Sequence, residues 1–214
     1  MFTGHIGIKA PSNRSYFLTR SISDLWLWWA LIHTVSYLVT SVPRTLFGTS
    51  GIATIITGII ALVMEIWVLD RYLGDFNWQQ WVVVNIVGGV LVLVVAVLPS
   101  ILLRTILGSA AQEGTLQAQL YNVSTAILSA LIISLAQWRV LTHYVRGYGA
   151  RPWIVANIVS SVIGTLSLGV ANELTSDKYV HIAGDALSAL IGSLIVGYTL
   201  MQILRPYAPA AASA

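Results

Sequence analysis

The sequence predicts an all-α polytopic membrane protein, and three observations support this fold class. Hydrophobic residues make up 57% of the 214 residues, charged residues make up 9%, and the mean hydropathy is +0.80. Charged residues alone account for roughly a quarter of an ordinary soluble domain. Six apolar stretches reach or approach the roughly 20 residues that a helix needs to cross a bilayer. Nothing shows the alternating pattern of a membrane barrel, and unpaired backbone groups are too costly in lipid for an open sheet.

The apolar stretches define one transmembrane domain over residues 24–205. In chain order, the predicted spans are 24–42, 51–70, 81–103, 121–141, 153–171 and 180–203. The segment 1–23 contains no separate apolar core, so we expect a cytoplasmic N-terminal segment and a first span that acts as an uncleaved signal. The tail, 206–214, has nothing to bury and is expected to be disordered.

The basic residues near the span ends predict the orientation in the membrane. If the N-terminus is cytoplasmic, the eight basic residues on that side are Lys9, Arg14, Arg20, Arg71, Arg139, Arg146, Arg151 and Arg205, and the three on the opposite side are Arg44, Arg104 and Lys178. We therefore expect both termini in the cytoplasm, with the protein in a bacterial inner membrane or another energy-transducing membrane. The pI near 9.3 then reflects topology and anionic headgroups, and no basic patch or motif indicates nucleic acid.

A tandem repeat relates the middle four spans. The segment 68–90 aligns with the segment 140–162 without a gap and is identical to it at nine positions. The identities place Val68, Leu69, Tyr72, Trp81, Val83, Asn85, Ile86, Val87 and Val90 on Val140, Leu141, Tyr144, Trp153, Val155, Asn157, Ile158, Val159 and Val162. Because both connecting loops fall on the cytoplasmic side, the copies, about 51–103 and 121–172, are predicted to be parallel helical hairpins.

A second, shorter sequence match extends the repeat to the ends of the chain. The segment ILSALIISL at 127–135 matches ALSALIGSL at 186–194 in seven of nine positions. In the first span, Trp29 and His33 have the same spacing as Trp81 and Asn85. The last and first spans therefore look like the two halves of a third hairpin, which would close a ring with the last span beside the first.

Polar side chains within the spans predict a clasp in each hairpin. Glu65 and Asn85 lie at similar depth on either side of one cytoplasmic turn, and Gln137 and Asn157 occupy the same places in the second copy. Interhelical hydrogen bonds in membranes contribute roughly 0.6 to 2 kcal/mol each, so we expect Glu65 to pair with Asn85 and Gln137 with Asn157. The tryptophans that precede the two asparagines, Trp81 and Trp153, are expected at the cytoplasmic headgroup level.

Two further places carry candidate ligands. His181 and Asp185 are one helical turn apart at the outer end of the last span, where they predict either a hydrated helix start, a proton or cation site, or a metal site. His33 lies among aromatic residues, and an intramembrane imidazole of this kind is either a packing residue or a ligand to the metal of a haem or chlorophyll. A proton or ligand site at Glu65 is the alternative to the clasp.

Two short segments resemble known families. A set of residues near the N-terminus resembles the start of small bacterial membrane proteins related to metal-dependent hydrolases: Met1, Phe2, Gly4, His5 and Gly7, followed by Asp24, Leu25 and Trp28. That resemblance implies a membrane hydrolase, for which His5, Asp24, His181 and Asp185 are the candidate metal-site residues. The segments Gln-Trp-x-x-Leu at 137–141 and Trp-x-x-Ala-Asn at 153–157 resemble small polytopic membrane proteins of bacteria and cyanobacteria, and this resemblance implies no activity.

Three functions follow from these patterns. The leading one is a structural or accessory membrane protein that binds a partner subunit or a lipid-like or pigment ligand, either among other subunits or as a homo-oligomer. It is favoured because the polar residues are few and pairable and because no nucleophile elbow, zinc motif, phosphate loop or dinucleotide fingerprint indicates an enzyme. The alternatives are a small ion- or proton-coupled transporter and a metal-dependent membrane hydrolase.

Overall fold

The computed structural model describes residues 22–47, 51–73, 75–99, 105, 116–145, 147–174 and 177–207. These residues form six α-helices and no strand. The α-helices are α1 (Leu25–Phe47), α2 (Gly51–Tyr72), α3 (Trp78–Val92), α5 (Leu116–Leu141), α6 (Arg151–Leu174) and α7 (Lys178–Leu204). Short 3-10 turns precede α1 (η1, Ile22–Asp24) and follow α7 (η4, Arg205–Tyr207), and α3 continues into a π-helical turn (η2, Leu93–Val97).

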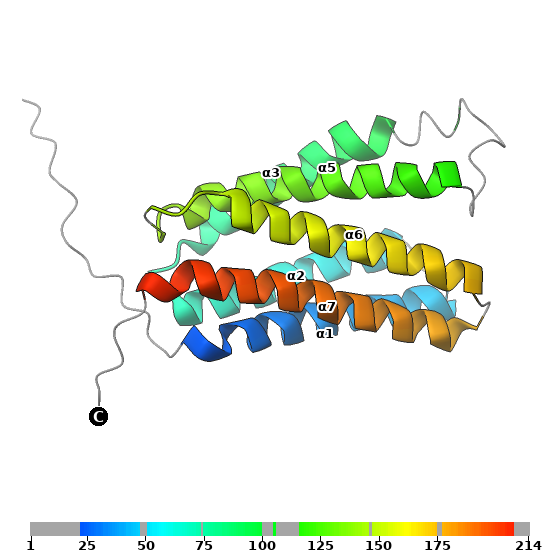
Figure 1. The fold of residues 1–214 in the computed structure, drawn as a ribbon, viewed down its shortest axis with the longest axis horizontal. Coiled ribbons are helices and arrows are strands. Elements are labelled where there is room, and N and C mark those ends of the chain that lie inside the picture. Colours follow the sequence, from blue (N-terminus) through cyan, green and yellow to red (C-terminus); the bar gives the residue numbers. More distant parts are fainter. Residues whose placement is uncertain are drawn as a thin grey trace, which may run out of the picture.

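Each apolar stretch identified in the sequence falls on one of these helices, except that residues 93–97 of the stretch 81–103 form η2 and its residues 100–103 lie outside the described part of the chain. Three of the helices, over Trp78–Val95, Ala118–Leu141 and Lys178–Leu204, are long and apolar enough to cross a membrane. This indicates a membrane protein. The helices run along the long axis of the molecule, so their length sets its longest dimension (Figure 1). Of the predicted tail, residues 206 and 207 belong to η4, whereas 208–214 and residues 1–21 lie outside the described part of the chain.

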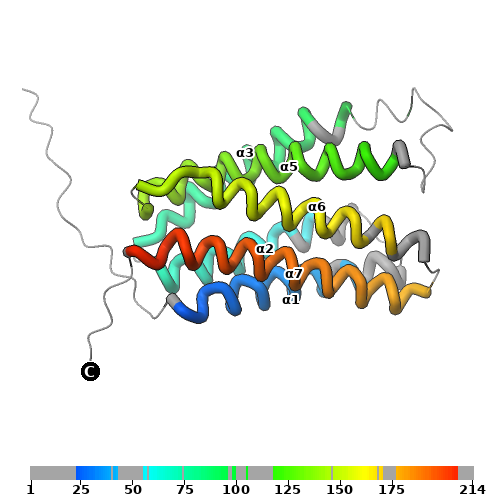
Figure 2. Tube along the Cα trace, in the orientation of Figure 1, coloured from blue at the N-terminus to red at the C-terminus, as the bar shows by residue number. Residues whose placement is uncertain are grey.

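The helices form a ring in chain order (Figure 2). Four pairs of helices pack side by side: α1 with α2, α3 with α5, α5 with α6, and α6 with α7. Helix α7 also packs against α1, and this contact is the most extensive of all. The predicted placement of the last span beside the first is therefore confirmed. The remaining neighbours, α2 and α3, touch only slightly.

The tightly packed core lies at one end of the ring. Its buried side chains come from the first turns of α1, α3 and α6 and from the last turns of α2, α5 and α7, and they include Leu25, Trp29, Leu69, Tyr72, Trp81, Leu141, Trp153, Leu200 and Leu204. At this end the backbone N–H of Asn77 donates to Tyr144 Oη at 2.7 Å, which joins the α2–α3 turn to the α5–α6 turn. The core therefore fixes the helix ends, and the polar residues described below lie directly beyond it.

The outward faces of the helices are apolar. Large aliphatic side chains such as Ile55, Val83 and Leu187 are more than half exposed, and similar residues occur on every helix of the ring. Exposed aliphatic faces of this extent are unfavourable in water but are the expected surface of helices that contact lipid. The arrangement therefore agrees with the apolar composition.

A glycine permits the close approach of α7 to α1. A Cβ atom at Gly197 would lie 2.9 Å from the Trp26 carbonyl oxygen and 2.9 Å from Trp29 Cβ. Because the Trp26 oxygen is backbone, it cannot turn aside as the end of a long side chain could. By contrast, a Cβ at Gly58 on α2 would meet nothing within 4 Å.

We expect Gly197→Ala to destabilise the bundle by about 1 to 3 kcal/mol, because the added methyl group must push α1 and α7 apart. Thermal unfolding in mild detergent measures the effect. Gly58→Ala is the matched control and should leave the melting temperature unchanged or slightly raised. Equal melting temperatures for the two variants would contradict the close packing of α1 and α7.

Candidate functional site

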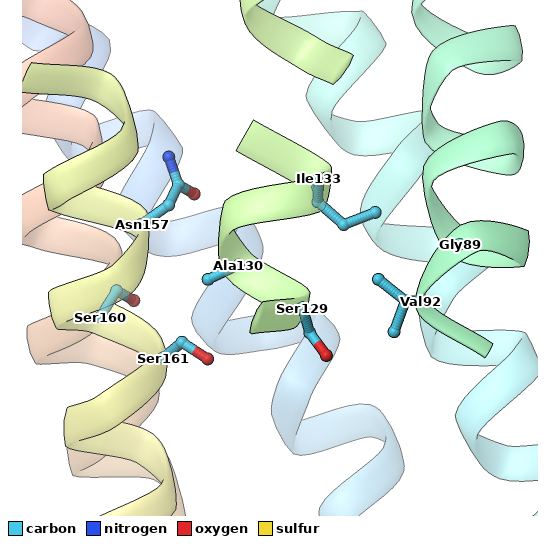
Figure 3. Close-up of a pocket in the computed structure, with 8 residues that line it drawn as sticks. All are labelled: Gly89, Val92, Ser129, Ala130, Ile133, Asn157, Ser160 and Ser161. Atoms are coloured by element: carbon cyan, nitrogen blue, oxygen red, sulfur yellow. The ribbon is translucent and has the colours of Figure 1, made fainter. Parts of the chain in front are cut away.

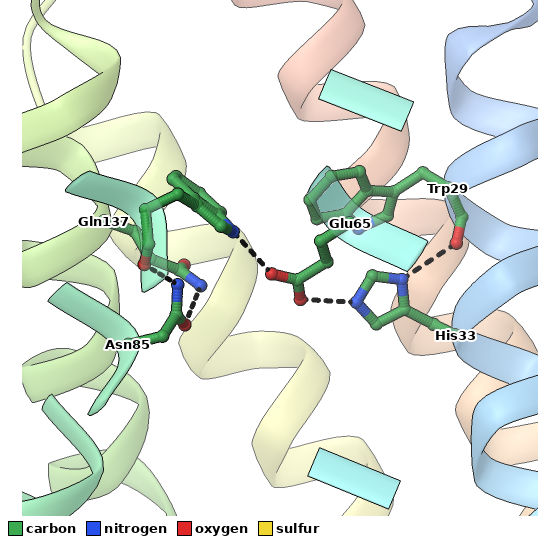
Figure 4. A network of polar contacts seen from close by, with 6 residues as sticks. Trp29, His33, Glu65, Asn85 and Gln137 are labelled. Carbon is green, nitrogen blue, oxygen red and sulfur yellow. Dashed lines mark hydrogen bonds and ion pairs between the residues drawn. The ribbon is translucent and has the colours of Figure 1, made fainter. Parts of the chain in front are cut away.

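Glu65 is held between two neighbouring helices. Its Oε1 lies 2.9 Å from His33 Nε2 on α1, and its Oε2 accepts a hydrogen bond of 2.9 Å from the indole Nε1–H of Trp81 on α3 (Figure 4). The Glu65 side chain is 12% exposed and that of His33 is 24% exposed. Both carboxyl oxygens are therefore paired in a site that is largely removed from solvent.

His33 is positioned by Trp29, one turn earlier on α1. Its Nδ1 lies 3.0 Å from the Trp29 carbonyl oxygen, and the imidazole stacks on the Trp29 indole with ring centroids 4.8 Å apart. Both ring nitrogens of His33 are thus engaged. Ligation of a haem or chlorophyll metal by His33 would require one of these two contacts to break.

A second polar contact links α3 to α5. Gln137 Nε2–H donates to Asn85 Oδ1 at 3.0 Å, and Asn85 Nδ2–H donates to the Trp81 carbonyl oxygen at 2.8 Å. Gln137 is buried, at 5% exposure. Together with the Glu65 contacts, these bonds run without interruption from α1 through α2 and α3 to α5.

The predicted clasp pairs are wrong. Glu65 bonds to His33 and Trp81 instead of Asn85, and Gln137 bonds to Asn85 instead of Asn157. The distance of each residue from its turn gives its depth correctly, but it does not give the direction in which the side chain points from its helix. Asn85 points toward α5, so that Trp81, one turn earlier, is the residue on α3 that reaches Glu65.

The same local geometry occurs on three helices. His33, Asn85 and Asn157 each bond through a side-chain nitrogen to the carbonyl oxygen of the tryptophan four residues earlier, on α1, α3 and α6 respectively. The tryptophans of these pairs are 2%, 0% and 0% exposed. Both indoles therefore point into the core and not toward the surroundings of the bundle, while their depth at the cytoplasmic headgroup level stays a prediction.

The surroundings of the two fully buried tryptophans differ in one respect. Trp81 donates to Glu65, whereas Trp153 Nε1 is buried and has no hydrogen-bond partner among the described residues. In the sequence alignment Gln137 takes the place of Glu65, yet its amide nitrogen is used by Asn85. The two hairpins thus share a framework but differ in the group placed at its centre.

The candidate metal residues do not converge in the described part of the chain. No group of three or more His, Cys, Asp or Glu side chains there could hold a metal ion. Asp185 is buried, at 7% exposure, and His181 lies one turn before it on α7. Asp24 is exposed and accepts a hydrogen bond from Ser23, while His5 lies outside the described residues.

A groove lies among α3, α5 and α6 (Figure 3). It has a volume of about 340 Å³ and is lined by Gly89, Val92, Ser129, Ala130, Ile133, Asn157, Ser160 and Ser161. The Ser129 and Ser161 hydroxyls donate to backbone carbonyls of α5, and the Asn157 amide donates to Trp153. The groove is thus mainly apolar, and three of its polar residues donate to the backbone.

The contact between His33 and Glu65 was not anticipated from the sequence, although a signal for it exists. His33 lies roughly four helical turns before Phe47, where α1 ends, and Glu65 lies roughly four turns after Gly51, where α2 begins. Consecutive antiparallel helices place such positions at the same depth. The equal distance of His33 and Glu65 from the connection between α1 and α2 would therefore have indicated the pair.

Comparisons with known proteins give no assignment for this site. No protein-family model, no curated protein and no solved structure matches the chain. We therefore interpret the site from its geometry.

We expect Trp81→Phe to destabilise the protein by about 1 to 2 kcal/mol more than Trp153→Phe. Both changes remove a buried indole of the same size, but only the first leaves an oxygen of Glu65 without its donor. Chemical denaturation in detergent micelles, followed by circular dichroism, measures the difference. Equal losses would show that the Trp81–Glu65 bond contributes nothing to stability.

Proposed function

We propose that this chain is a small proton-coupled membrane carrier whose proton site is the His33–Glu65 pair. Ionisable side chains inside a membrane domain are costly and are retained mainly where they act on ions or protons. Three features of the pair support the proposal: both of its side chains are ionisable types, they are in direct contact at 2.9 Å, and both are largely buried.

The observation that carries the proposal is the difference between two polar links, one between α3 and α5 and the other between α1 and α2. At Gln137 and Asn85, two neutral amides link neighbouring helices with a hydrogen bond of 3.0 Å. At Glu65 and His33, two ionisable groups link neighbouring helices in the same way. Desolvating charged groups costs several kcal/mol more than desolvating amides, so a purely structural link has no need of them. Proton exchange does need them.

The proposal includes six membrane spans in three similar hairpins, with both termini in the cytoplasm of an inner membrane. The helices that fall outside the three long apolar ones, α1, α2 and α6, contain 23, 22 and 24 residues. At 1.5 Å per residue they are roughly 33 to 36 Å long, which suffices to cross a hydrocarbon core of about 30 Å. The excess of basic residues on the proposed cytoplasmic side supports the orientation.

The slight contact between α2 and α3 supplies a mechanism for coupling. Because these helices touch little elsewhere, the Glu65–Trp81 bond is one of the main links between them. A carboxylate accepts this bond more strongly than a protonated carboxyl group does. A proton that moves onto Glu65 therefore weakens the link and favours a state in which α2 and α3 separate.

The groove on α3, α5 and α6 favours a second candidate function, an accessory protein that retains a lipid. Its occupant would be the hydrocarbon chain of a bilayer lipid, since the groove is mainly apolar and, in the proposed topology, lies at the depth of the hydrocarbon core. Its width depends on small residues such as Gly89, where an added Cβ would meet nothing within 4 Å. The metal-dependent hydrolase stays a hypothesis that rests on the N-terminal resemblance.

We expect Glu65→Gln to abolish proton flux while leaving the fold intact. The amide can still accept from Trp81 and can donate to a neutral His33, but it carries no exchangeable acidic proton. Flux is measured in liposomes that contain a trapped pH-sensitive dye, with a potassium diffusion potential as the driving force. The wild-type protein should acidify the lumen several-fold faster than the variant.

The matched control is Gln137→Glu, which changes charge in the other hairpin and leaves the His33–Glu65 contact in place. It should retain flux at least equal to that of the wild-type protein. Equal rates for the wild-type protein, Glu65→Gln and empty liposomes would rule out the proposed proton coupling.

For the second candidate, we expect Gly89→Leu to fill the groove and reduce the amount of copurifying phospholipid. Native mass spectrometry of protein extracted in mild detergent measures bound lipid, and the stability of the variant should be unchanged because the added side chain meets open space. Unaltered lipid binding would exclude the groove as a lipid site.

A further inference from the structure

We infer that His33 and Glu65 together hold a single exchangeable proton, which lies between His33 Nε2 and Glu65 Oε1, so that the pair is electrically neutral wherever that proton resides. The inference defines the chemical state of the site. Only the use of this proton in transport rests on the proposed function.

The hydrogen bond to Trp29 fixes one nitrogen of the imidazole. His33 Nδ1 lies 3.0 Å from the Trp29 carbonyl oxygen, which has no hydrogen to donate. Nδ1 must therefore carry a hydrogen in both the neutral and the charged imidazole. Only Nε2 is left to gain or lose a proton.

The hydrogen bond from Trp81 fixes one oxygen of the carboxyl group in the same way. Glu65 Oε2 accepts from the Trp81 indole N–H at 2.9 Å, and an indole nitrogen donates only. A proton on Oε2 would compete with that donor, so a protonated Glu65 carries its proton on Oε1. The two atoms that can exchange a proton are then the two that lie 2.9 Å apart.

Electrostatics restrict the pair of atoms, His33 Nε2 and Glu65 Oε1, to one shared proton. With one proton, the pair is either imidazolium and carboxylate or imidazole and carboxylic acid, and its net charge is zero in both cases. With two protons or none, it has a charge of +1 or −1 and loses the hydrogen bond between Nε2 and Oε1. Burial of an uncompensated charge costs far more than burial of a neutral hydrogen-bonded pair.

Among the described residues, no neighbouring charge compensates the unfavourable states. Arg71, on α2, lies 5.2 Å from the Trp67 ring centroid and 5.7 Å from that of Trp28, roughly 9 Å along the helix from Glu65. On α7, Asp185 lies roughly two turns beyond His33, since Gly197 is the residue that meets Trp29. Helix α3 has no ionisable side chain, and in the described ranges no further group forms an ion pair with His33 or Glu65.

The amide pair between α3 and α5 supplies a template for a control without the proton. The double variant His33→Asn with Glu65→Gln reproduces the amide pair of Asn85 and Gln137, including the side-chain bond to the tryptophan carbonyl. The opposite exchange, Asn85→His with Gln137→Glu, places an ionisable pair between α3 and α5. There the buried Trp153 N–H, which has no partner among the described residues, becomes available to a carboxylate.

The test determines where the protons are in the full-length protein in nanodiscs, with no gradient applied. Nitrogen-15 NMR of labelled histidine reports the protonation of each ring nitrogen of His33, and infrared spectroscopy reports the carbonyl stretch of a protonated Glu65. The amide double variant identifies the signals that belong to the pair.

We expect His33 Nδ1 to be protonated in both states of the pair. The carboxylic acid band of Glu65 should appear only in the fraction of molecules in which His33 is neutral. In the double variant Asn85→His with Gln137→Glu, the carboxylic acid band should likewise appear only where the introduced imidazole is neutral. A bare Nδ1, an imidazolium beside a carboxylic acid, or a neutral imidazole beside a carboxylate would overturn the inference. A one-proton pair in a protein without flux would overturn the proposed function alone.

Discussion

A carboxyl group in a bundle of apolar helices needs a hydrogen-bond partner for each of its oxygens, and Glu65 finds its two partners on two different helices. His33 supplies one from α1, and Trp81 supplies the other, a donor, from α3. The rotation of three helices is thereby fixed at one depth. The tight core at the adjoining end sets where these helices begin and end, but the polar contacts decide which of their faces meet.

The two hairpins perform similar structural tasks with different chemistry. Each places a tryptophan at the start of its second helix and a polar residue one turn later, and in each that residue bonds back to the tryptophan carbonyl. The first hairpin adds Glu65, which pairs with His33 on α1, and the second uses the neutral amide of Gln137, which reaches toward α3. Because the framework is shared, the cost of the charged groups stands out as a feature that stability does not explain.

The slight contact of α2 with α3 and the extensive contact of α7 with α1 give the ring one weak side and one strong side. Helices that pack through glycine, as α7 does at Gly197, are hard to separate because their backbones are in contact. Helices joined mainly by a hydrogen bond respond to the protonation of its acceptor. Glu65 lies at this weak side of the ring, which is where the proposed proton coupling would act.

The sequence by itself determined the helical class, the positions of most of the helices and the three polar residues Glu65, Asn85 and Gln137, because hydropathy and depth follow from composition and from distance along a helix. It also determined that α7 lies beside α1, through the spacing of Trp29 and His33. Only the tertiary structure decided the partners. His33 meets Glu65, Trp81 rather than Asn85 reaches Glu65, and Trp153 stays unpaired among the described residues. These outcomes depend on the rotation of each helix about its axis, and the packing of all six helices sets that rotation jointly. The sequence of a helix that is apolar nearly all round does not encode it.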